Sequence, residues 1–427
     1  MKKKLLLALS LLMVAAMLFA AGQRGSSDTT LTVWDFKSGE EGSGKAFREI
    51  DRLFMQQNPG VTINRIAQPR DQYYQILTPA LRAGTAPDVI MIHPDPRAWA
   101  LQQFFLDLTP HIRDVRGTYS SAALRASSPT QNPNGDTKML PLTAQGMGIY
   151  YNKQNFQRAG LNPNNPPRTW NEFLAACEAL RRAGIDPIIF GTPHGVCFTY
   201  RVILATLYGA EGIEGFRNGR SNFTDPEFRL ATQMIRELFD RNFINVEAGS
   251  ISYFMDAIEM FKAGRGGFYP GLNSDIANWF DFGNALGGFQ NVGYFSSPVH
   301  PTARFPNAQV NQGAGIGYAV NTNSRNTELA VKYAIFNTSG QGAKIFMDYT
   351  GAIVPNNSVP IDANNALLSQ VLTAMNANPA GDFMQALPAG MSEDLLHPIQ
   401  FRFFISREIT IDEYIRQVQA LYTNSLR

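Results

Sequence analysis

Strand and helix patterns alternate near the beginning of the chain, and this alternation constrains the fold more than any other feature. Runs rich in β-branched and apolar residues lie at 31–34, 61–66 and 88–92, as expected of strands. Between them, apolar side chains recur at helical spacing over 46–54 and 74–81. Strands joined by crossover helices pair in parallel, so this segment predicts an α/β fold built on a parallel sheet.

Further elements are predicted along the chain. Thr169 and Glu172 have the spacing of a capping box, so a helix is expected to begin after Thr169. Ile188-Ile189-Phe190 predicts a short buried strand, and Tyr269-Pro270-Gly271 predicts a turn. The other expected elements are a strand at 316–320, helices at 257–263, 328–336 and 343–349, and a largely helical segment at 405–426. A chain of 427 residues with this pattern suggests about two domains.

The first 22 residues have the features of a secretory signal peptide. Lys2–Lys4 precede an apolar run that only Ser10 interrupts, and Ala20-Ala21-Gly22 offers small residues for cleavage. The run is too short and wrongly flanked for a transmembrane anchor, and no cysteine follows it for lipid attachment. We therefore expect a soluble periplasmic protein whose mature chain begins near Gln23 and carries no lipid anchor.

The charge balance excludes one class of partner. Without Lys2–Lys4 the chain has 34 basic and 35 acidic residues. This balance provides no electrostatic attraction for nucleic acid or anionic membranes, so no nucleic-acid partner is expected.

The two cysteines, Cys177 and Cys197, leave two interpretations open. They are either buried thiols or a disulfide, which an oxidising periplasm permits.

The sequence lacks the usual patterns of catalytic and metal sites. The five histidines are scattered, and two cysteines without clustered histidines fall short of four zinc ligands. The segment Gly39–Lys45 nearly spells a phosphate-binding loop, but Ala46 stands where Ser or Thr should hold Mg²⁺. No H-E-x-x-H or G-x-S-x-G motif occurs. We therefore expect no metal, no cofactor and no enzymatic activity.

Six groups of short motifs follow one another in the order found in a known family. They are Leu31-Thr32-Val33-Trp34-Asp35-Phe36; Asn58-Pro59-Gly60-Val61; Leu81-Arg82-Ala83-Gly84-Thr85-Ala86-Pro87-Asp88-Val89; Leu140-Pro141-Leu142 with Tyr150-Tyr151-Asn152-Lys153; Ala159-Gly160-Leu161 with Thr169-Trp170-Asn171-Glu172-Phe173; and Tyr318-Ala319-Val320-Asn321-Thr322-Asn323-Ser324. By these motifs the chain resembles the extracellular solute-binding proteins of the sugar ABC importers (family 1, the maltose- and glycerol-phosphate-binding group). The resemblance extends from about Leu31 to Pro355, and the export signal agrees with it.

The resemblance implies a two-lobed periplasmic-binding-protein fold (type II). This is an α/β fold whose parallel-sheet lobes are joined by crossing strands, with a ligand cleft between them that closes by hinge bending. The crossings are expected near Thr143–Gly146, Gly313–Gly315 and Gly351–Pro355, where glycine permits the backbone changes of a hinge. The implied units are a signal peptide at 1–22, an N-terminal lobe at 23–144 plus 315–352, and a C-terminal lobe at 145–314 plus 353–427.

Sugar recognition requires aromatic faces for the apolar side of a pyranose and planar polar groups for its hydroxyls. Residues of these kinds lie on loops at predicted strand ends or where the family contacts its solute. The candidate contacts are Trp34, Phe36, Glu40, Tyr73, Asp95, Gln145, His194, Asn273, Trp279, Gly313 and Arg402.

Several of these candidates have a second interpretation. Trp34 suits the core as well as the cleft, and Glu40 suits a solvated loop. His194 is expected in a polar loop between Gly191 and Gly195, and Asn273 stands where the family often has an aromatic residue. Arg402 favours a phosphorylated or acidic ligand if it faces the cleft, and is otherwise a surface cation.

The resemblance implies a monomeric substrate-binding component of an ABC importer. Such a protein captures a sugar or sugar-like solute and delivers it to the transmembrane subunits of the permease. Two other interpretations stay open. One is a secreted carbohydrate-active enzyme, because catalytic carboxylates can lie far apart in sequence. The other is a solute sensor that docks on a chemoreceptor or kinase.

Overall fold

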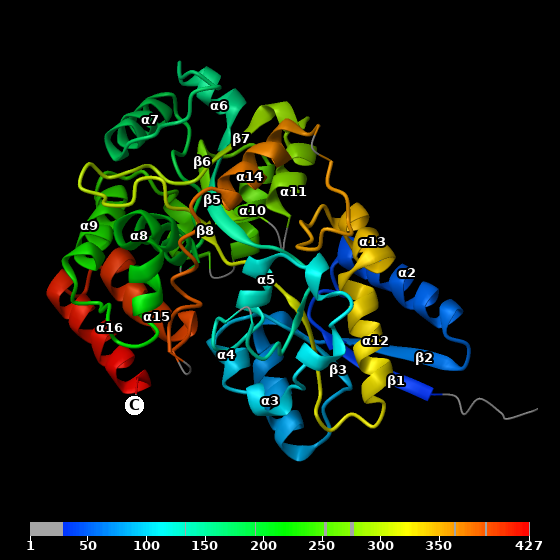
Figure 1. Cartoon of the computed structure of the whole chain (residues 1–427). Helices are drawn as coiled ribbons and strands as arrows, with labels where there is room; N and C mark the ends of the chain where they lie inside the picture. Colours follow the sequence, from blue (N-terminus) through cyan, green and yellow to red (C-terminus); the bar gives the residue numbers. More distant parts are fainter. Residues whose placement is uncertain are drawn as a thin grey trace, which may run out of the picture.

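Two lobes lie side by side, each with a sheet and surrounding helices (Figure 1). The structure is a computed structural model that describes residues 29–426 except 133, 193, 252–253, 274–276, 363 and 389–390. The predicted signal peptide, residues 1–22, and its cleavage site lie outside the described residues. Among the described helices, none is long and apolar enough to cross a membrane.

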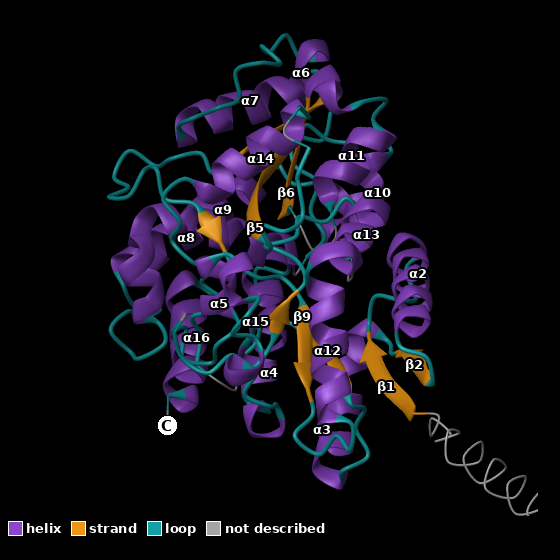
Figure 2. Ribbon diagram, turned by 45° about the vertical axis from the view of Figure 1, so that its right-hand side comes forward, coloured by secondary structure: helices purple, strands orange, loops and turns teal. Residues whose placement is uncertain are grey.

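Five strands form the sheet of the first lobe, and helices cover it (Figure 2). The elements of this lobe are β1 (Thr29–Asp35), α2 (Glu41–Gln57), β2 (Val61–Ala67), α3 (Tyr73–Ala83), β3 (Val89–Ile92), α4 (Pro96–Trp99), α5 (Ser121–Ala126), β4 (Leu140–Pro141), β9 (Gly317–Val320), α12 (Thr327–Thr338) and α13 (Gly340–Thr350). The strand order is β2-β1-β3-β9-β4. β1 is parallel to β2 and β3, and α2 and α3 form the predicted crossovers.

Four strands form the sheet of the second lobe. The elements of this lobe are β5 (Gly146–Asn152), α6 (Lys153–Arg158), α7 (Trp170–Arg182), α8 (His194–Gly215), α9 (Pro226–Asp240), α10 (Phe254–Lys262), β6 (Phe268–Leu272), α11 (Asn278–Ala285), β7 (Val292–Phe295), β8 (Val310–Asn311), α14 (Ala366–Asn376), α15 (Glu393–Gln400) and α16 (Ile411–Ser425). Thr169 and Glu172 form the predicted capping box at the start of α7.

The two-lobed α/β fold is confirmed. The prediction of a parallel sheet in each lobe is wrong, because the first sheet is mixed and the described strands of the second pair antiparallel. β9 runs antiparallel to β3 and β4, and β5 runs antiparallel to β6, β7 and β8. The antiparallel direction of β5 and β9 follows from the path of the chain between the lobes. β5 and β9 each arrive from the other lobe, so they enter their sheets at the edge where neighbouring strands end.

Two local predictions in the second lobe were wrong. Tyr269-Pro270-Gly271 lies within β6 and not in a turn. β6 is an edge strand of its sheet, where the missing N–H of proline is tolerated. In the predicted strand at 188–190, only Ile188 makes β-bridges, and these are isolated contacts with Ile244 and Phe268.

The chain passes between the two sheets in three places. The first crossing, 142–145, connects β4 to β5, and the second, 312–316, connects β8 to β9. The third, 351–365, connects α13, which packs on α2, to α14, which packs on β7. Gly313 in the second crossing has φ +74°, and a Cβ there would lie 2.2 Å from the carbonyl oxygen of Ala122. Only glycine fits this position without strain.

The buried apolar side chains form two main cores, one in each lobe. The first-lobe core draws on residues between Leu31 and Leu142 and between Ala314 and Ala352. The second-lobe core draws on residues between Met147 and Val310 and between Ile353 and Tyr422. From this division we propose the lobe boundaries expected from the sequence, 23–144 plus 315–352 and 145–314 plus 353–427.

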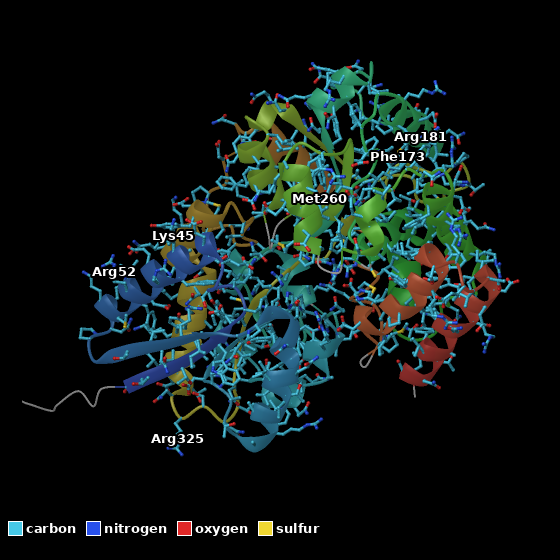
Figure 3. All side chains as sticks on the ribbon, turned by 180° about the vertical axis from the view of Figure 1, so that it is seen from behind. Lys45, Arg52, Phe173, Arg181, Met260 and Arg325 are labelled. Carbon is cyan, nitrogen blue, oxygen red and sulfur yellow. The ribbon has the colours of Figure 1, made fainter. Side chains whose placement is uncertain are left out.

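Two other sequence expectations concern single segments. Cys177 and Cys197 are free and buried, so the thiol interpretation describes this structure. The segment that resembles a phosphate loop contains a helix start, because α2 begins at Glu41. Lys45 pairs with Glu41 at 2.7 Å and lies with Arg52 along α2 at the outer side of the first lobe (Figure 3).

Candidate functional site: a cavity between the lobes

A cavity of about 390 Å³ lies between the two lobes. This volume is within the range of roughly 300–1,000 Å³ that is typical of small-molecule sites. Its lining residues are Arg70, Asp71, Tyr73, Tyr74, His93, Pro94, Asp95, Pro96 and Arg97 from the first lobe; His194, Phe198, Arg201, Phe254, Leu272, Met384, Gln385, Met391, Ser392, Glu393, Asp394 and His397 from the second; and Gln145, Gln312 and Gly315 from the crossings. Both lobes therefore contribute polar and aromatic side chains to one site.

Four of the predicted contacts are brought together at this cavity: Tyr73, Asp95, Gln145 and His194. Tyr73 is the first residue of α3, and its hydroxyl donates to the backbone oxygen of Trp34 at 3.2 Å. This bond ties the start of α3 to the end of β1, where the carboxyl ends of parallel strands commonly form a binding site.

Asp95 has two structural bonds besides its place at the cavity. Its side chain caps α4 by accepting from the backbone N–H of Arg97 at 2.9 Å and of Ala98 at 3.3 Å. Its other oxygen pairs with the Arg97 guanidinium at 2.6 Å. Arg97 in turn lies 4.9 Å from the ring centroid of Tyr74. The first-lobe wall therefore presents a fixed carboxylate, a fixed guanidinium and an aromatic ring.

Gln145 begins a polar network that extends from the crossings into the second lobe. Its Nε2 donates to Oε1 of Gln312, and Nε2 of Gln312 donates to Asp382. The Asp382 carboxylate lies 3.6 Å from Nε of Arg201, which also pairs with Glu393 through Nη2. Oε1 of Gln145 is buried and has no hydrogen-bond partner among the described residues, so it can accept a bond from a solute hydroxyl.

His194 lies at the cavity but not in the loop where we expected it. It is the first residue of α8, and its ring lies 5.0 Å from Phe254 and 5.1 Å from His397. Glycine and polar residues suggested a loop at 191–195. They are also accepted in the first turn of a helix, because the N–H groups there have no partner within the helix.

The histidines of the cavity are neutral at pH 7, and Glu393 is ionised. Burial lowers the pKa of His93 and His194 below the usual range and that of His397 to about 4. For Glu393, burial acts to raise the pKa, but nearby positive charge, chiefly that of Arg201 and also that of Arg97, outweighs it and holds the pKa below its usual value.

Phe36 and Glu40 were predicted contacts, yet they stand behind the cavity wall. The ring of Phe36 stacks on that of His93 with centroids 4.5 Å apart. Glu40 pairs with Lys37 at 2.8 Å and with Arg70 at 3.3 Å. Both residues therefore hold cavity-lining side chains in place and do not line the cavity.

The remaining predicted contacts also lie outside the cavity lining. Trp34 is half-buried and packs against the first-lobe core, in line with its core interpretation. Asn273 is fully buried and accepts from the backbone at the start of β5 at 2.7 Å. Trp279 donates to the backbone of the third crossing at 2.9 Å, and Gly313 packs on the α5 backbone. Arg402 is an exposed cation that pairs with Glu408 at 3.2 Å.

Several cavity residues were missed by sequence reasoning. Phe198 and Arg201 follow His194 by four and seven residues on α8, a spacing that puts all three on one helix face. Glu393 and His397 are likewise one turn apart on α15. A helical interpretation of these segments would have grouped the residues, but it would not have brought α8 and α15 together.

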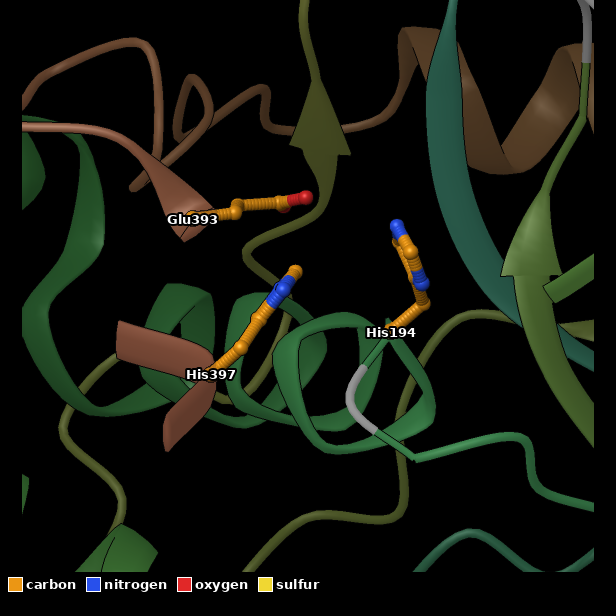
Figure 4. A group of neighbouring side chains, drawn as sticks. All are labelled: His194, Glu393 and His397. Atoms are coloured by element: carbon orange, nitrogen blue, oxygen red, sulfur yellow. The ribbon is translucent and has the colours of Figure 1, made fainter. Parts of the chain in front are cut away.

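The same elements create a cluster of potential metal ligands. Ligand atoms of His194, Glu393 and His397 all lie within 4.8 Å of one another (Figure 4). The sequence prediction of scattered histidines holds along the chain but not in space, because His194 and His397 come from different helices.

Comparison with known proteins agrees with this architecture. The sequence profile described as bacterial extracellular solute-binding protein matches residues 38–344. A binding protein from Brucella abortus is 28% identical over 269 residues, which cover 61% of this chain and 62% of that relative. The chain therefore aligns with less than two thirds of the length of this relative.

Two further matches extend over more of the chain. The multiple sugar-binding protein of Streptococcus mutans is 22% identical over 362 residues, which cover 80% of this chain and 79% of the relative. A solved chitin oligosaccharide binding protein has the same fold, with a TM-score of 0.80 and 19% identity over 94% of this chain and 99% of the other. Because the family profile matches most of its length, the chain belongs to the bacterial extracellular solute-binding proteins.

Proposed function

We propose that this chain is the periplasmic substrate-binding component of an ABC importer, which captures a sugar or sugar-like solute and delivers it to the membrane permease. The observation that carries the proposal is the cavity lined by both lobes and by two crossings. A solute that contacts both lobes binds their closed arrangement better and shifts the population toward it. In this proposal the protein acts as a monomer, catalyses no reaction and binds no nucleic acid.

We further propose that the solute is an uncharged sugar. The three arginines at the cavity already have carboxylate partners: Arg70 pairs with Glu40, Arg97 with Asp95, and Arg201 with Asp382 and Glu393. An anionic ligand would have to compete with these carboxylates, whereas sugar hydroxyls can bond to both members of a pair. The sugar ligands named for the S. mutans relative and the chitin-oligosaccharide-binding neighbour support this choice.

The proposed contacts combine two kinds of side chain. Tyr74, Phe198 and Phe254 offer aromatic surface on opposite lobes, which suits the apolar face of a pyranose. Asp95 and Gln145 offer planar polar groups for its hydroxyls. Tyr73 and His194 complete the set of predicted contacts at the cavity.

A thermal-shift screen tests this function. The purified protein is heated with monosaccharides, oligosaccharides, polyols and, as an anionic arm, glycerol phosphates. A sugar present at 100 times its Kd should add about 2.7 kcal/mol to the free energy of unfolding. Stabilisation by glycerol phosphate but by no uncharged sugar would reject the proposed ligand class. Stabilisation by no compound in the screen would reject the sugar-binding function, and cleavage of an oligosaccharide hit would reject a pure binding role.

Gln145→Ala is expected to weaken binding of the sugar found in this screen. The change removes the buried acceptor Oε1 and leaves a solute hydroxyl unpaired in a closed cavity, at a cost of about 1–3 kcal/mol. Titration calorimetry should show a Kd about 5- to 150-fold weaker. Gln157→Ala, an exposed position on α6, is the matched control and should bind as the wild type does. Unchanged affinity in folded Gln145→Ala would show that the solute does not contact Gln145 in the first crossing.

A further inference from the structure

His194, Glu393 and His397 converge on one point of the cavity wall (Figure 4). His194 begins α8, and Glu393 and His397 lie one turn apart on α15. Nδ1 of His194 and Nε2 of His397 are both buried and have no hydrogen-bond partner among the described residues. Two unpartnered imidazole nitrogens beside a carboxylate require an explanation, because buried polar atoms are normally satisfied.

We propose that His194, Glu393 and His397 bind a divalent transition-metal ion, with Zn²⁺ as the ion that this donor set fits. Two imidazoles and one carboxylate are a recurrent three-ligand set for zinc sites that keep one position open. Mg²⁺ and Ca²⁺ are disfavoured because they prefer oxygen ligands. The inference goes beyond solute capture and does not require it.

The spacing of the donors is compatible with such an ion after a small adjustment. Zn²⁺ lies roughly 2.0–2.2 Å from nitrogen and oxygen ligands, so ligands of a tetrahedral site are about 3.4 Å apart. The three donors lie within 4.8 Å of one another, so they need to approach by up to about 1.4 Å, which side-chain rotation can provide. Phe254 and Phe198 pack against His194 and limit where its ring can go.

The surroundings orient His397 for this role. Its Nδ1 faces Asp394, with 4.0 Å between Nδ1 and a carboxylate oxygen. A carboxylate on that side favours the tautomer with a proton on Nδ1 and leaves Nε2 unprotonated and able to bind a metal ion. Nε2 is also the nitrogen without a partner among the described residues.

The local charge also accommodates a cation. Arg201 is shared by two carboxylates, Asp382 and Glu393, so its single positive charge does not neutralise both of them. Three arginines and five carboxylates line or adjoin the cavity; they are Arg70, Arg97, Arg201, Asp71, Asp95, Asp382, Glu393 and Asp394. This excess of negative charge offsets the charge of a divalent ion. The three ligands line the cavity, so an ion bound by them would adjoin the space proposed for the solute.

The test is metal binding by protein without a histidine tag, after treatment with a chelator and in the absence of sugar. Titration calorimetry with Zn²⁺ alone should show one equivalent bound. His194→Ala and His397→Ala should each weaken binding by about 100-fold or more, since even indirect partners of metal ligands contribute about 10- to 100-fold. His111→Ala and His300→Ala, both outside the cluster, are controls that should bind as the wild type does.

A second readout guards against misfolded variants. His194→Gln and His397→Gln keep polar side chains of similar size, and their thermal unfolding is compared with that of the wild type. Co²⁺ should give a ligand-field spectrum with the wild type that is lost in folded His397→Gln. Absence of a bound equivalent of Zn²⁺, or equal binding by wild type and folded cluster variants, would overturn the proposal. Because no sugar is present, either result is independent of the thermal-shift screen.

Discussion

Arg201→Met is expected to destabilise the protein by about 3–5 kcal/mol, because it breaks a buried ion-pair network by removing one partner. The Arg201 side chain is only 9% exposed, and its partners Asp382 and Glu393 are 0% and 21% exposed. Without the guanidinium, the carboxylates of Asp382 and Glu393 stay in a poorly solvated environment and lose their shared cation. Solute binding by the remaining folded protein should also fall, because Arg201 lines the cavity and holds the network that reaches Gln145.

Chemical unfolding followed by circular dichroism measures this effect. Arg416→Met is the matched control, since its partner Glu413 is on the same exposed helix face, and it should cost no more than about 1 kcal/mol. Adding Asp382→Asn to Arg201→Met should recover part of the loss, because one uncompensated charge disappears. A loss as small as that of Arg416→Met would show that the network contributes little to stability.

Arg65→Met is expected to have a comparable effect on stability, about 3–5 kcal/mol, with no effect on the solute site. Arg65 pairs with Asp35 at 2.7 Å and with Asp51 at 2.8 Å, and it donates to the hydroxyls of Tyr318 and Tyr333. These contacts connect β2 with β1, α2, β9 and α12 inside the first lobe. The substitution therefore leaves two carboxylates buried without their cation.

The contrast with Arg201 separates stability from binding. Arg65 does not line the cavity, so folded Arg65→Met should keep the wild-type Kd for the sugar. Arg52→Met, which loses an exposed pair with Glu49 and an exposed hydrogen bond to Gln56, is the control for removal of an arginine and should cost at most about 1 kcal/mol. A large change in the Kd for the sugar, measured under conditions in which Arg65→Met is fully folded, would contradict the assignment of Arg65 to a purely structural role.

Local patterns predicted the first lobe well because its elements are set by nearby residues. The β1-α2-β2-α3-β3 segment follows apolar periodicity. In the second lobe, the start of α7 likewise follows a local signal, the Thr169 capping box. The directions of β5 and β9 depend on the other lobe, which no local pattern reports. The Pro270 turn was predicted from residue preference, but pairing with β5 at the sheet edge keeps this segment extended.

The site was predictable only where it follows strand ends and crossings. Tyr73, Asp95 and Gln145 lie at such points and line the cavity. Burial alternates along β1: Leu31 and Val33 are buried, and Trp34 lies on the opposite face of the strand. Arg201 and His397 are on helix faces from separate parts of the chain, and their meeting depends on tertiary packing.

Small-angle scattering with the sugar identified in the thermal-shift screen tests the central claim most directly. The claim is that a solute in the cavity draws together two lobes connected by three crossings. We expect the radius of gyration to decrease when saturating sugar is added and to return to its starting value when the sugar is removed. An unchanged scattering profile, with binding verified by calorimetry on the same sample, would contradict capture by closure of the lobes.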